Sequence, residues 1–104
     1  MPETPFALRN DSVFVGRRGD TDWWEWTAYI AASEPDSLDH IKYVEYYLHS
    51  SFRNPVKRVR KKEGGFRLES KGWGTFELRA KVVFKDKVRS PVLLSHLLEF
   101  EGAA

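Results

Sequence analysis

The sequence predicts an all-β domain in which antiparallel strands form a sandwich. Three observations lead to this fold class. Short stretches with alternating apolar and polar residues recur along the chain, turn-forming residues separate them, and aromatic residues make up 14% of the composition. Aromatic side chains pack well on pleated surfaces, and short strands separated by regular turns are typical of sandwiches. The 104 residues fit a single domain that is large enough to bury a hydrophobic core.

The first part of the chain contains a lead-in and two expected strands. Residues 1–10 hold two prolines and show no periodicity, which predicts a flexible lead-in before a domain that spans residues 11–101. Residues 12–15 form a short expected strand, and a polar turn that contains Gly19 follows it. Residues 23–32 alternate as a longer strand. The expected core face of this strand consists of Trp24, Trp26, Ala28 and Ile30.

The middle of the chain adds a third strand and a basic segment. A turn at residues 33–37 precedes a strand at residues 40–49, whose core side chains alternate from Val44 through Tyr46 to Leu48. The Asn-Pro pair at residues 54–55 then predicts a loop, because proline keeps the preceding residue out of helical backbone. Residues 56–62 are rich in lysine and arginine. They predict an edge strand or a solvated loop, since lysine on an edge prevents unwanted sheet pairing.

The last part of the chain holds three further elements. After a turn at residues 63–65, residues 66–70 alternate as a strand, and a loop follows. Residues 76–85 form the most regular strand, and residues 91–100 form a strand or a mixed strand and helical turn. The expected core face of residues 76–85 is Phe76, Leu78, Ala80, Val82 and Phe84. About seven to eight short strands without a long helix are typical of an immunoglobulin-like antiparallel β-sandwich.

Composition and charge exclude several classes of protein. Without cysteine the chain forms no disulfide, no cysteine-based zinc site and no thiol nucleophile. The net charge of +2, from 17 basic and 15 acidic residues, is too balanced to indicate nucleic-acid binding. No apolar run reaches the length of a membrane span and no signal-peptide pattern is present, so we expect no membrane insertion. The expected location is cytoplasmic, or nuclear only in a eukaryote, and residues 102–104 resemble the start of a linker to a fused effector domain.

Patterns for catalysis and for cofactors are absent from the sequence. His40, His49 and His96 lack the spacing of metal ligands, and no glycine-rich phosphate loop precedes a helix. His49 lies beside two serines, but a catalytic triad also needs an orienting acid and an oxyanion hole. We therefore predict a non-catalytic binding module without metal or cofactor.

Two expected loops combine aromatic residues with small and hydroxyl residues. If the loops meet, Phe52 and Trp73 would form a slot, in which a stacked planar group gains about 0.5–1.5 kcal/mol beyond burial. The Ser51 hydroxyl can donate to a carbonyl, and glycine lets a backbone N–H approach the same carbonyl. Such a slot fits the neutral amide of an acylated lysine better than an ammonium group. The candidate residues are His49, Ser51, Phe52, Gly72, Trp73, Gly74 and Phe76.

These motifs and their order resemble the YEATS domain family. The resemblance rests on Leu-His-Ser-Ser-Phe and Asn-Pro within residues 44–55, on Gly-Trp-Gly-Thr-Phe at residues 72–76, and on the segments at residues 82–85 and 92–98. It covers roughly residues 23–100. YEATS domains are immunoglobulin-like and read acetyl-lysine or crotonyl-lysine, so the resemblance implies an acylated-lysine peptide or protein as the partner.

The resemblance also implies roles for individual residues. Phe52 and Trp73 would form the aromatic sandwich, and Ser51 and the Trp73 backbone would hold the acyl amide. His49 would brace Ser51, and Phe76 would line the far end of the slot. Gly72 and Gly74 would permit close approach. Eukaryotic members carry a first loop with an aromatic residue and a histidine, whereas residues 20–24 occupy its place here, with Trp23 as a possible wall. The prokaryotic branch of the family is therefore the better match.

Other interpretations of the aromatic loops remain open at this point. Phe52 and Trp73 would be ordinary core residues if packing alone placed them, and Phe76 heads an apolar strand face, which favours the core. A scaffolding sandwich in a bacterial multidomain protein would display the loops to another protein without any acyl-lysine pocket. A carbohydrate-binding module would need two or more exposed tryptophans in one plane.

Overall fold

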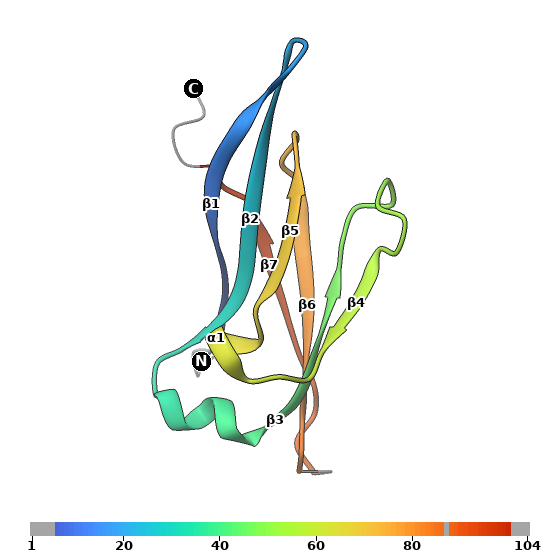
Figure 1. Cartoon of the computed structure of the whole chain (residues 1–104). Coiled ribbons are helices and arrows are strands. Elements are labelled where there is room, and N and C mark those ends of the chain that lie inside the picture. Colours follow the sequence, from blue (N-terminus) through green and yellow to red (C-terminus); the bar gives the residue numbers. More distant parts are fainter. Residues whose placement is uncertain (1–5, 87, 101–104) are drawn as a thin grey trace.

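The computed structural model describes residues 6–86 and 88–100, and within these ranges seven strands form two antiparallel sheets (Figure 1). One sheet has three strands in the order β1-β2-β5, and the other has four in the order β4-β3-β6-β7. The predicted all-β sandwich is confirmed. The elements are β1 (Phe6–Arg18), β2 (Thr21–Ala32), the 3-10 helix η1 (Pro35–His40), β3 (Ile41–Tyr47), β4 (Val56–Val59), α1 (Glu63–Phe66), β5 (Leu68–Gly72), β6 (Glu77–Phe84) and β7 (Val92–Leu97).

The core lies between the two sheets and follows the predicted alternation of side chains. The inward residues of β2 and β3 are buried as expected, and so are those of β6 from Leu78 to Phe84. Tyr46 is fully buried, and its hydroxyl donates to the backbone oxygen of Phe66 over 2.6 Å. Burial raises the pKa of the Tyr46 phenol, because a charged phenolate would lose its hydration there. The buried Tyr46 hydroxyl thus has the hydrogen-bond partner that a buried polar group needs.

The predicted lead-in differs from the structure over residues 6–10. These residues belong to β1, which pairs with β2 from Phe6 opposite Ala32 to Arg18 opposite Thr21. Phe6 and Leu8 are buried in the core. Only two inward residues mark this stretch, so its periodicity is too short to predict a strand, and the pairing with β2 supplies the missing stabilisation. The expectations for residues 1–5 and 101–104 lie outside the described residues.

The turn after β4 adopts a more specific shape than the sequence indicates. Gly64 and Gly65 have φ angles of 65° and 76°, inside the short helical segment α1. A Cβ at Gly65 would lie 2.4 Å from the backbone oxygen of Ile30, so only glycine fits against β2. Phe66 points into the core instead of starting the next strand, and β5 therefore begins at Leu68 rather than at residue 66.

Two further segments resolve the alternatives that the sequence leaves open. Residues 91–100 contain the strand β7 at Val92–Leu97. Of the basic segment at residues 56–62, Val56–Val59 form β4, which lies at an edge of its sheet as predicted, and residues 60–62 follow it outside the strand. The turn expected at residues 33–37 continues into η1. Within the described ranges, no helix combines the length and apolar character that crossing a membrane would require.

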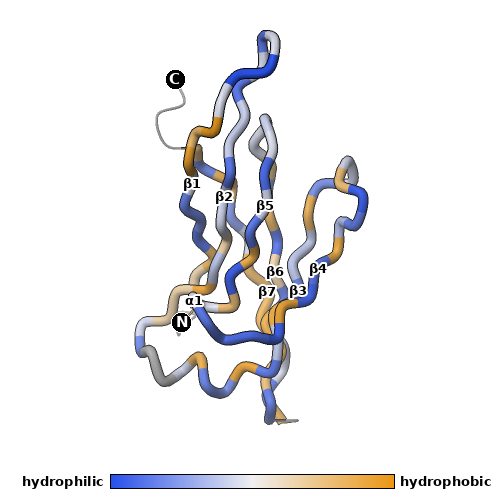
Figure 2. Tube along the Cα trace, in the orientation of Figure 1, coloured by the Kyte–Doolittle hydropathy of each residue, from blue (hydrophilic) through white to orange (hydrophobic). Residues whose placement is uncertain are grey.

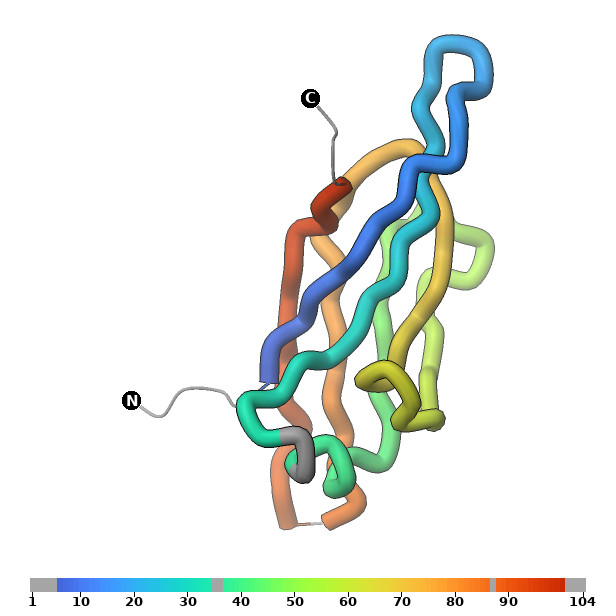
Figure 3. Tube along the Cα trace, turned by 60° about the vertical axis from the view of Figure 1, so that its left-hand side comes forward, coloured from blue at the N-terminus to red at the C-terminus, as the bar shows by residue number. Residues whose placement is uncertain are grey.

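The β1–β2 hairpin projects beyond the rest of the sandwich (Figures 1 and 3). Its outer part lacks a third strand, because β5 pairs with β2 only between Trp24 and Ala28. The residues at its end are hydrophilic (Figure 2). The β3–β4 and β5–β6 loops lie at this same end of the molecule (Figure 1), which brings the two candidate loops together.

Candidate functional site

A pocket of about 450 Å³ lies between the β3–β4 and β5–β6 loops, beside the base of the projecting hairpin. All residues that the sequence singles out for the slot line it, including Trp23 as the additional wall. Lys71 and Thr75, which the sequence pattern did not indicate, also line it. Their positions next to the Gly-Trp-Gly motif were the available signal. The complete lining is Trp23, His49, Ser51, Phe52, Lys71, Gly72, Trp73, Gly74, Thr75 and Phe76.

The floor of the pocket is aromatic and continues into the core. Phe52 is half-buried, and its ring lies 5.5 Å from the ring of Phe76 and 6.5 Å from that of Trp26 in an edge-on arrangement. The Phe76 ring also contacts Trp26 edge-on, with a centroid separation of 6.0 Å. Such pairs add about 0.5–1.5 kcal/mol each beyond the burial of area. Phe52 and Phe76 therefore both pack on the core and present a face to the pocket.

The outer walls of the pocket are tryptophans with different surroundings. Trp73 is 66% exposed, which is unusual for the largest apolar side chain. Trp23 is half-buried, and the guanidinium of Arg18 lies over its ring, 5.3 Å from the centroid. This cation–π contact holds the Trp23 ring of β2 against the Arg18 side chain at the end of β1. One wall is thus held by the hairpin, whereas Trp73 has little protein around it.

A compact turn positions Ser51 at the edge of the pocket. The backbone N–H of Phe52 donates to the His49 oxygen over 3.0 Å, and the N–H of Leu48 donates to the Pro55 oxygen over 2.6 Å. Inside this turn, the backbone N–H of Ser51 donates to His49 Nδ1 over 3.1 Å. The Ser51 hydroxyl oxygen lies 2.9 Å from the same nitrogen. The contact between His49 and Ser51 that the resemblance implies is therefore present.

Gly72, the last residue of β5, and Gly74, in the β5–β6 loop, both border open space. A Cβ added at Gly72 or Gly74 would meet no protein atom within 4 Å, and neither residue has the positive φ that demands glycine. The fold therefore does not require glycine at either position. A close-lying ligand would supply a reason for it.

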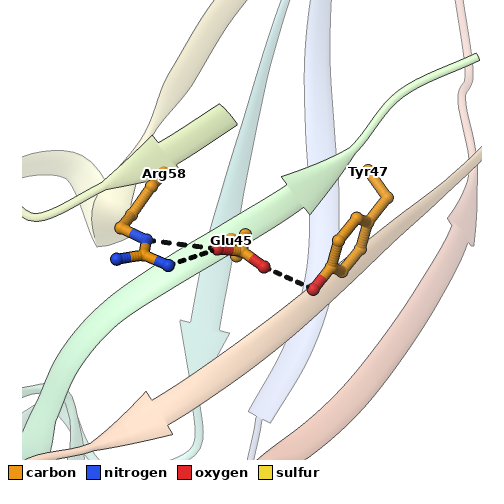
Figure 4. A network of polar contacts seen from close by, with 3 residues as sticks. All are labelled: Glu45, Tyr47 and Arg58. Carbon is orange, nitrogen blue, oxygen red and sulfur yellow. Dashed lines mark hydrogen bonds and ion pairs between the residues drawn. The ribbon is translucent and has the colours of Figure 1, made fainter. Parts of the chain in front are cut away.

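A separate polar cluster lies on the outer face of the four-stranded sheet (Figure 4). The Tyr47 hydroxyl donates to Glu45 Oε1 over 2.6 Å, and Arg58 donates through Nε and Nη2 to Glu45 Oε2 over 3.1 and 2.8 Å. The bond from Tyr47 and the bonds from Arg58 lower the pKa of the Glu45 carboxyl. The same Tyr47 bond raises the pKa of that phenol to about 12. All three side chains have partners within the cluster, which explains their positions without a ligand.

Comparison with known proteins identifies the family. The family model for the prokaryotic YEATS domain matches residues 24–94, and the chain belongs to this family. It is 29% identical to the transcription initiation factor TFIID subunit 14 of Schizosaccharomyces pombe, over 97% of this chain and 39% of that protein. It is 33% identical to the AF-9 homolog of Eremothecium gossypii, over 65% of this chain and 32% of that protein. The chain spans well under half the length of these relatives.

Solved structures of YEATS domains share the fold. The Yaf9 YEATS domain recognising an H3K122suc peptide superposes with a TM-score of 0.72 at 24% identity, covering 97% of this chain and 79% of that one. The Yaf9 YEATS domain bound to H3K27ac superposes with a TM-score of 0.73 at 23% identity, covering 99% and 79%. At these identities the likeness shows the immunoglobulin-like YEATS sandwich.

Proposed function

We propose that this domain binds an acylated lysine side chain, without catalysis, in the pocket between Phe52 and Trp73. The observation that carries the proposal is that one pocket combines an exposed tryptophan, a half-buried aromatic floor and a serine fixed by His49. The acyl amide is flat and neutral, so it can lie against the rings without the desolvation cost of an ammonium group.

The hydrogen bonds of the turn suggest which way the amide would lie. His49 Nδ1 accepts the Ser51 backbone N–H, so this nitrogen carries no proton. The Ser51 hydroxyl beside it is then best placed to donate to Nδ1 as well, which leaves the lone pairs of Oγ to accept from a ligand. Ser51 would accept the amide N–H of the acylated lysine. This reverses the donor role expected from the sequence, and the ligand carbonyl would turn towards the backbone of the β5–β6 loop.

The relatives support this type of ligand. Yaf9 YEATS domains have been solved with a succinylated and with an acetylated H3 peptide, which makes an acylated peptide the natural class of partner to test. A scaffolding module without an acyl-lysine pocket would present a flat aromatic surface to its partner. The concave pocket does not favour a scaffolding module. A carbohydrate-binding module would need exposed tryptophans in one plane, whereas Trp23 is half-buried.

Calorimetric titration with matched peptides tests the proposal. One peptide sequence would carry unmodified, acetylated or crotonylated lysine, and we expect binding only for the acylated forms. Trp73→Ala should abolish it, while circular dichroism shows an intact fold, because the side chain is mostly exposed. Leu93→Ala is the matched control, since Leu93 is 75% exposed on β7 and does not line the pocket. A folded wild-type domain that binds none of the peptides would overturn the proposal.

A further inference from the structure

The pocket and its rim have an asymmetric charge. Among the lining residues Lys71 is a cation, and none is a carboxylate. Arg18 covers the Trp23 wall, and Arg53 follows Phe52 directly in the β3–β4 loop. Both Lys71 and Arg53 are exposed. A ligand that enters the pocket would therefore meet positive charge on the hairpin side and on the loop side.

The carboxylates that adjoin the pocket are compensated within the protein. Asp22 precedes Trp23 in the chain and forms an ion pair with Arg17 over 2.8 Å. Glu77 follows Phe76 and forms an ion pair with Arg79 over 2.8 Å. Each of these acids is held by an arginine, so neither leaves a full negative charge to offset the cations of the rim.

The other carboxylates of this sheet line a hollow that adjoins the pocket at Lys71. Glu25 is opposite Lys71 in the β2–β5 pairing, and it lines a separate hollow together with Asp11 and Glu69. Lys71 also borders this hollow, and it therefore marks the boundary between an acidic face and the pocket. Glu25 offsets part of the positive potential that Lys71 produces at the rim of the pocket. Arg18 adds positive potential there from the hairpin.

We propose that this site takes an acylated lysine that is accompanied by a carboxylate, and that Lys71 and Arg18 contact this carboxylate. The inference rests on the proposed acyl-lysine function and adds the chemistry of its partner. Two sources can supply the carboxylate. It belongs either to an Asp or Glu beside the acylated lysine in the partner chain, or to the acyl group itself. In both cases a partner with lysine or arginine beside the acylated residue binds less well, because its charge is repelled by the rim.

The expected size of the effect follows from exposed ion pairs. Such pairs stabilise by about 0.2–1 kcal/mol, which corresponds to roughly 1.5- to 5-fold in affinity per carboxylate. The effect should shrink as salt is added, because screening shortens the Debye length from about 10 Å at 0.1 M to about 3 Å at 1 M.

The test uses four peptides of equal length and the intact domain. Three carry acetyl-lysine with neutral, acidic or basic neighbours, and the fourth carries succinyl-lysine with neutral neighbours. The dissociation constants would be measured for the wild type, Lys71→Gln, Arg18→Gln and Lys85→Gln. Lys85 is an exposed cation that follows β6 at the end of the molecule away from the pocket, and it serves as the matched control.

We expect tighter binding of the acidic-neighbour peptide or of the succinylated peptide than of the neutral acetylated one, and this difference identifies the source of the carboxylate. The ratio should fall in Lys71→Gln and Arg18→Gln but not in Lys85→Gln. Equal affinities, or a ratio that neither pocket substitution changes, would overturn the inference while acetyl-lysine binding stands. If no acylated peptide binds a folded domain, both the proposed function and this inference fail.

Discussion

At the residue scale, His49 determines what Ser51 can offer to a ligand. Nδ1 of the imidazole accepts the Ser51 backbone N–H over 3.1 Å, and the Ser51 hydroxyl oxygen lies 2.9 Å from the same nitrogen. In the neutral ring the proton then lies on Nε2. A histidine that appears in the sequence as a neighbour of the binding serine is, in the structure, the group that fixes the turn and orients the serine hydroxyl.

An amide-to-ester exchange in the ligand tests this orientation. Replacing the N–H of the acylated lysine by oxygen removes the proton that Ser51 would accept, and the expected loss is about 1–3 kcal/mol. The loss should be much smaller in Ser51→Ala, because the partner is already missing. Dissociation constants of both ligands for both proteins complete the double-mutant cycle. Equal losses in the two proteins would contradict the assigned role of Ser51.

Substitution of Gly74 by alanine tests ligand contact without disturbing the fold. Alanine at this position would meet no protein atom, and the backbone tolerates it, so stability should be unchanged or rise by up to about 1 kcal/mol. Binding of an acylated peptide should weaken if the ligand occupies that space. Thermal unfolding and calorimetric titration measure the two effects separately. An alanine variant that binds as well as the wild type would show that the ligand lies elsewhere.

Substitution of Phe52 cannot test binding separately from stability. The sequence predicts Phe52 and Trp73 as equivalent walls of the slot, but Phe52 packs against Trp26 and Phe76 at the edge of the core. Removing the Phe52 ring should therefore reduce stability as well as binding. Trp73 is the better residue for testing function because few protein contacts depend on it.

At the element scale, Asn10 connects β1 to the chain after β7. Its Nδ2 donates to the Glu99 oxygen over 2.8 Å, and its Oδ1 accepts from the Glu99 backbone N–H over 3.0 Å. Oδ1 also accepts from His96 Nε2 over 2.7 Å. These bonds link the two sheets across one open side of the sandwich, which gives His96 a structural role.

Loss of the Asn10 side chain should destabilise the domain. Asn10→Ala leaves the Glu99 backbone and His96 without these partners, and we expect a loss of about 1–3 kcal/mol in the free energy of unfolding. Urea denaturation provides the measurement. Asn54→Ala, in the exposed part of the β3–β4 loop, is the control for removing an asparagine. Equal midpoints for the two variants would show that water replaces the Asn10 bonds at no cost.

The Glu45–Tyr47–Arg58 cluster predicts a pH dependence for the four-stranded sheet. Tyr47 has a pKa of about 12 in the folded protein, above the value of about 10 for an unfolded chain. The folded state keeps a proton that the unfolded state loses, so this contribution to stability is complete below about pH 10 and disappears as the pH rises towards about 12.

Phenolate absorbance during an alkaline titration measures this effect. In Glu45→Gln the carboxylate that accepts from Tyr47 is lost, and the Tyr47 transition should move towards lower pH. Tyr47→Phe should remove one late transition, which assigns the signal. An unchanged titration in Glu45→Gln would mean that burial, rather than this hydrogen bond, raises the pKa.

At the scale of the whole molecule, strand position should determine local stability. β2, β3 and β6 each pair with a strand on both sides, and their inward residues form most of the core. The end of the β1–β2 hairpin extends beyond the rest of the sandwich, and Val15, which lies past the last pairing of β5 with β2, is about half exposed. We expect amide hydrogen exchange to be slowest in β2, β3 and β6 and fast at residues 15–21. Equal protection of the hairpin end would indicate that it packs against another molecule in solution.

The sequence by itself determined the class of fold, the core faces of the central strands and the composition of the pocket. Alternation with a period of two carries this information locally, since it directly assigns each side chain of a strand to one face. The aromatic, serine and glycine motifs similarly mark loops, because such residues have little reason to end a strand together. The family resemblance and the observed lining of the pocket agree with this local information.

Only the tertiary structure decided the features that depend on partners distant in the chain. β1 extends to Phe6 because β2 pairs with it, and Asn10 acquires its bonds only when residues 96–99 lie beside it. Phe52 packs against the core through Trp26, and Arg18 lies over Trp23, which lines the pocket. Packing and charge act through space, so a chain that is read one residue at a time cannot show which groups will meet.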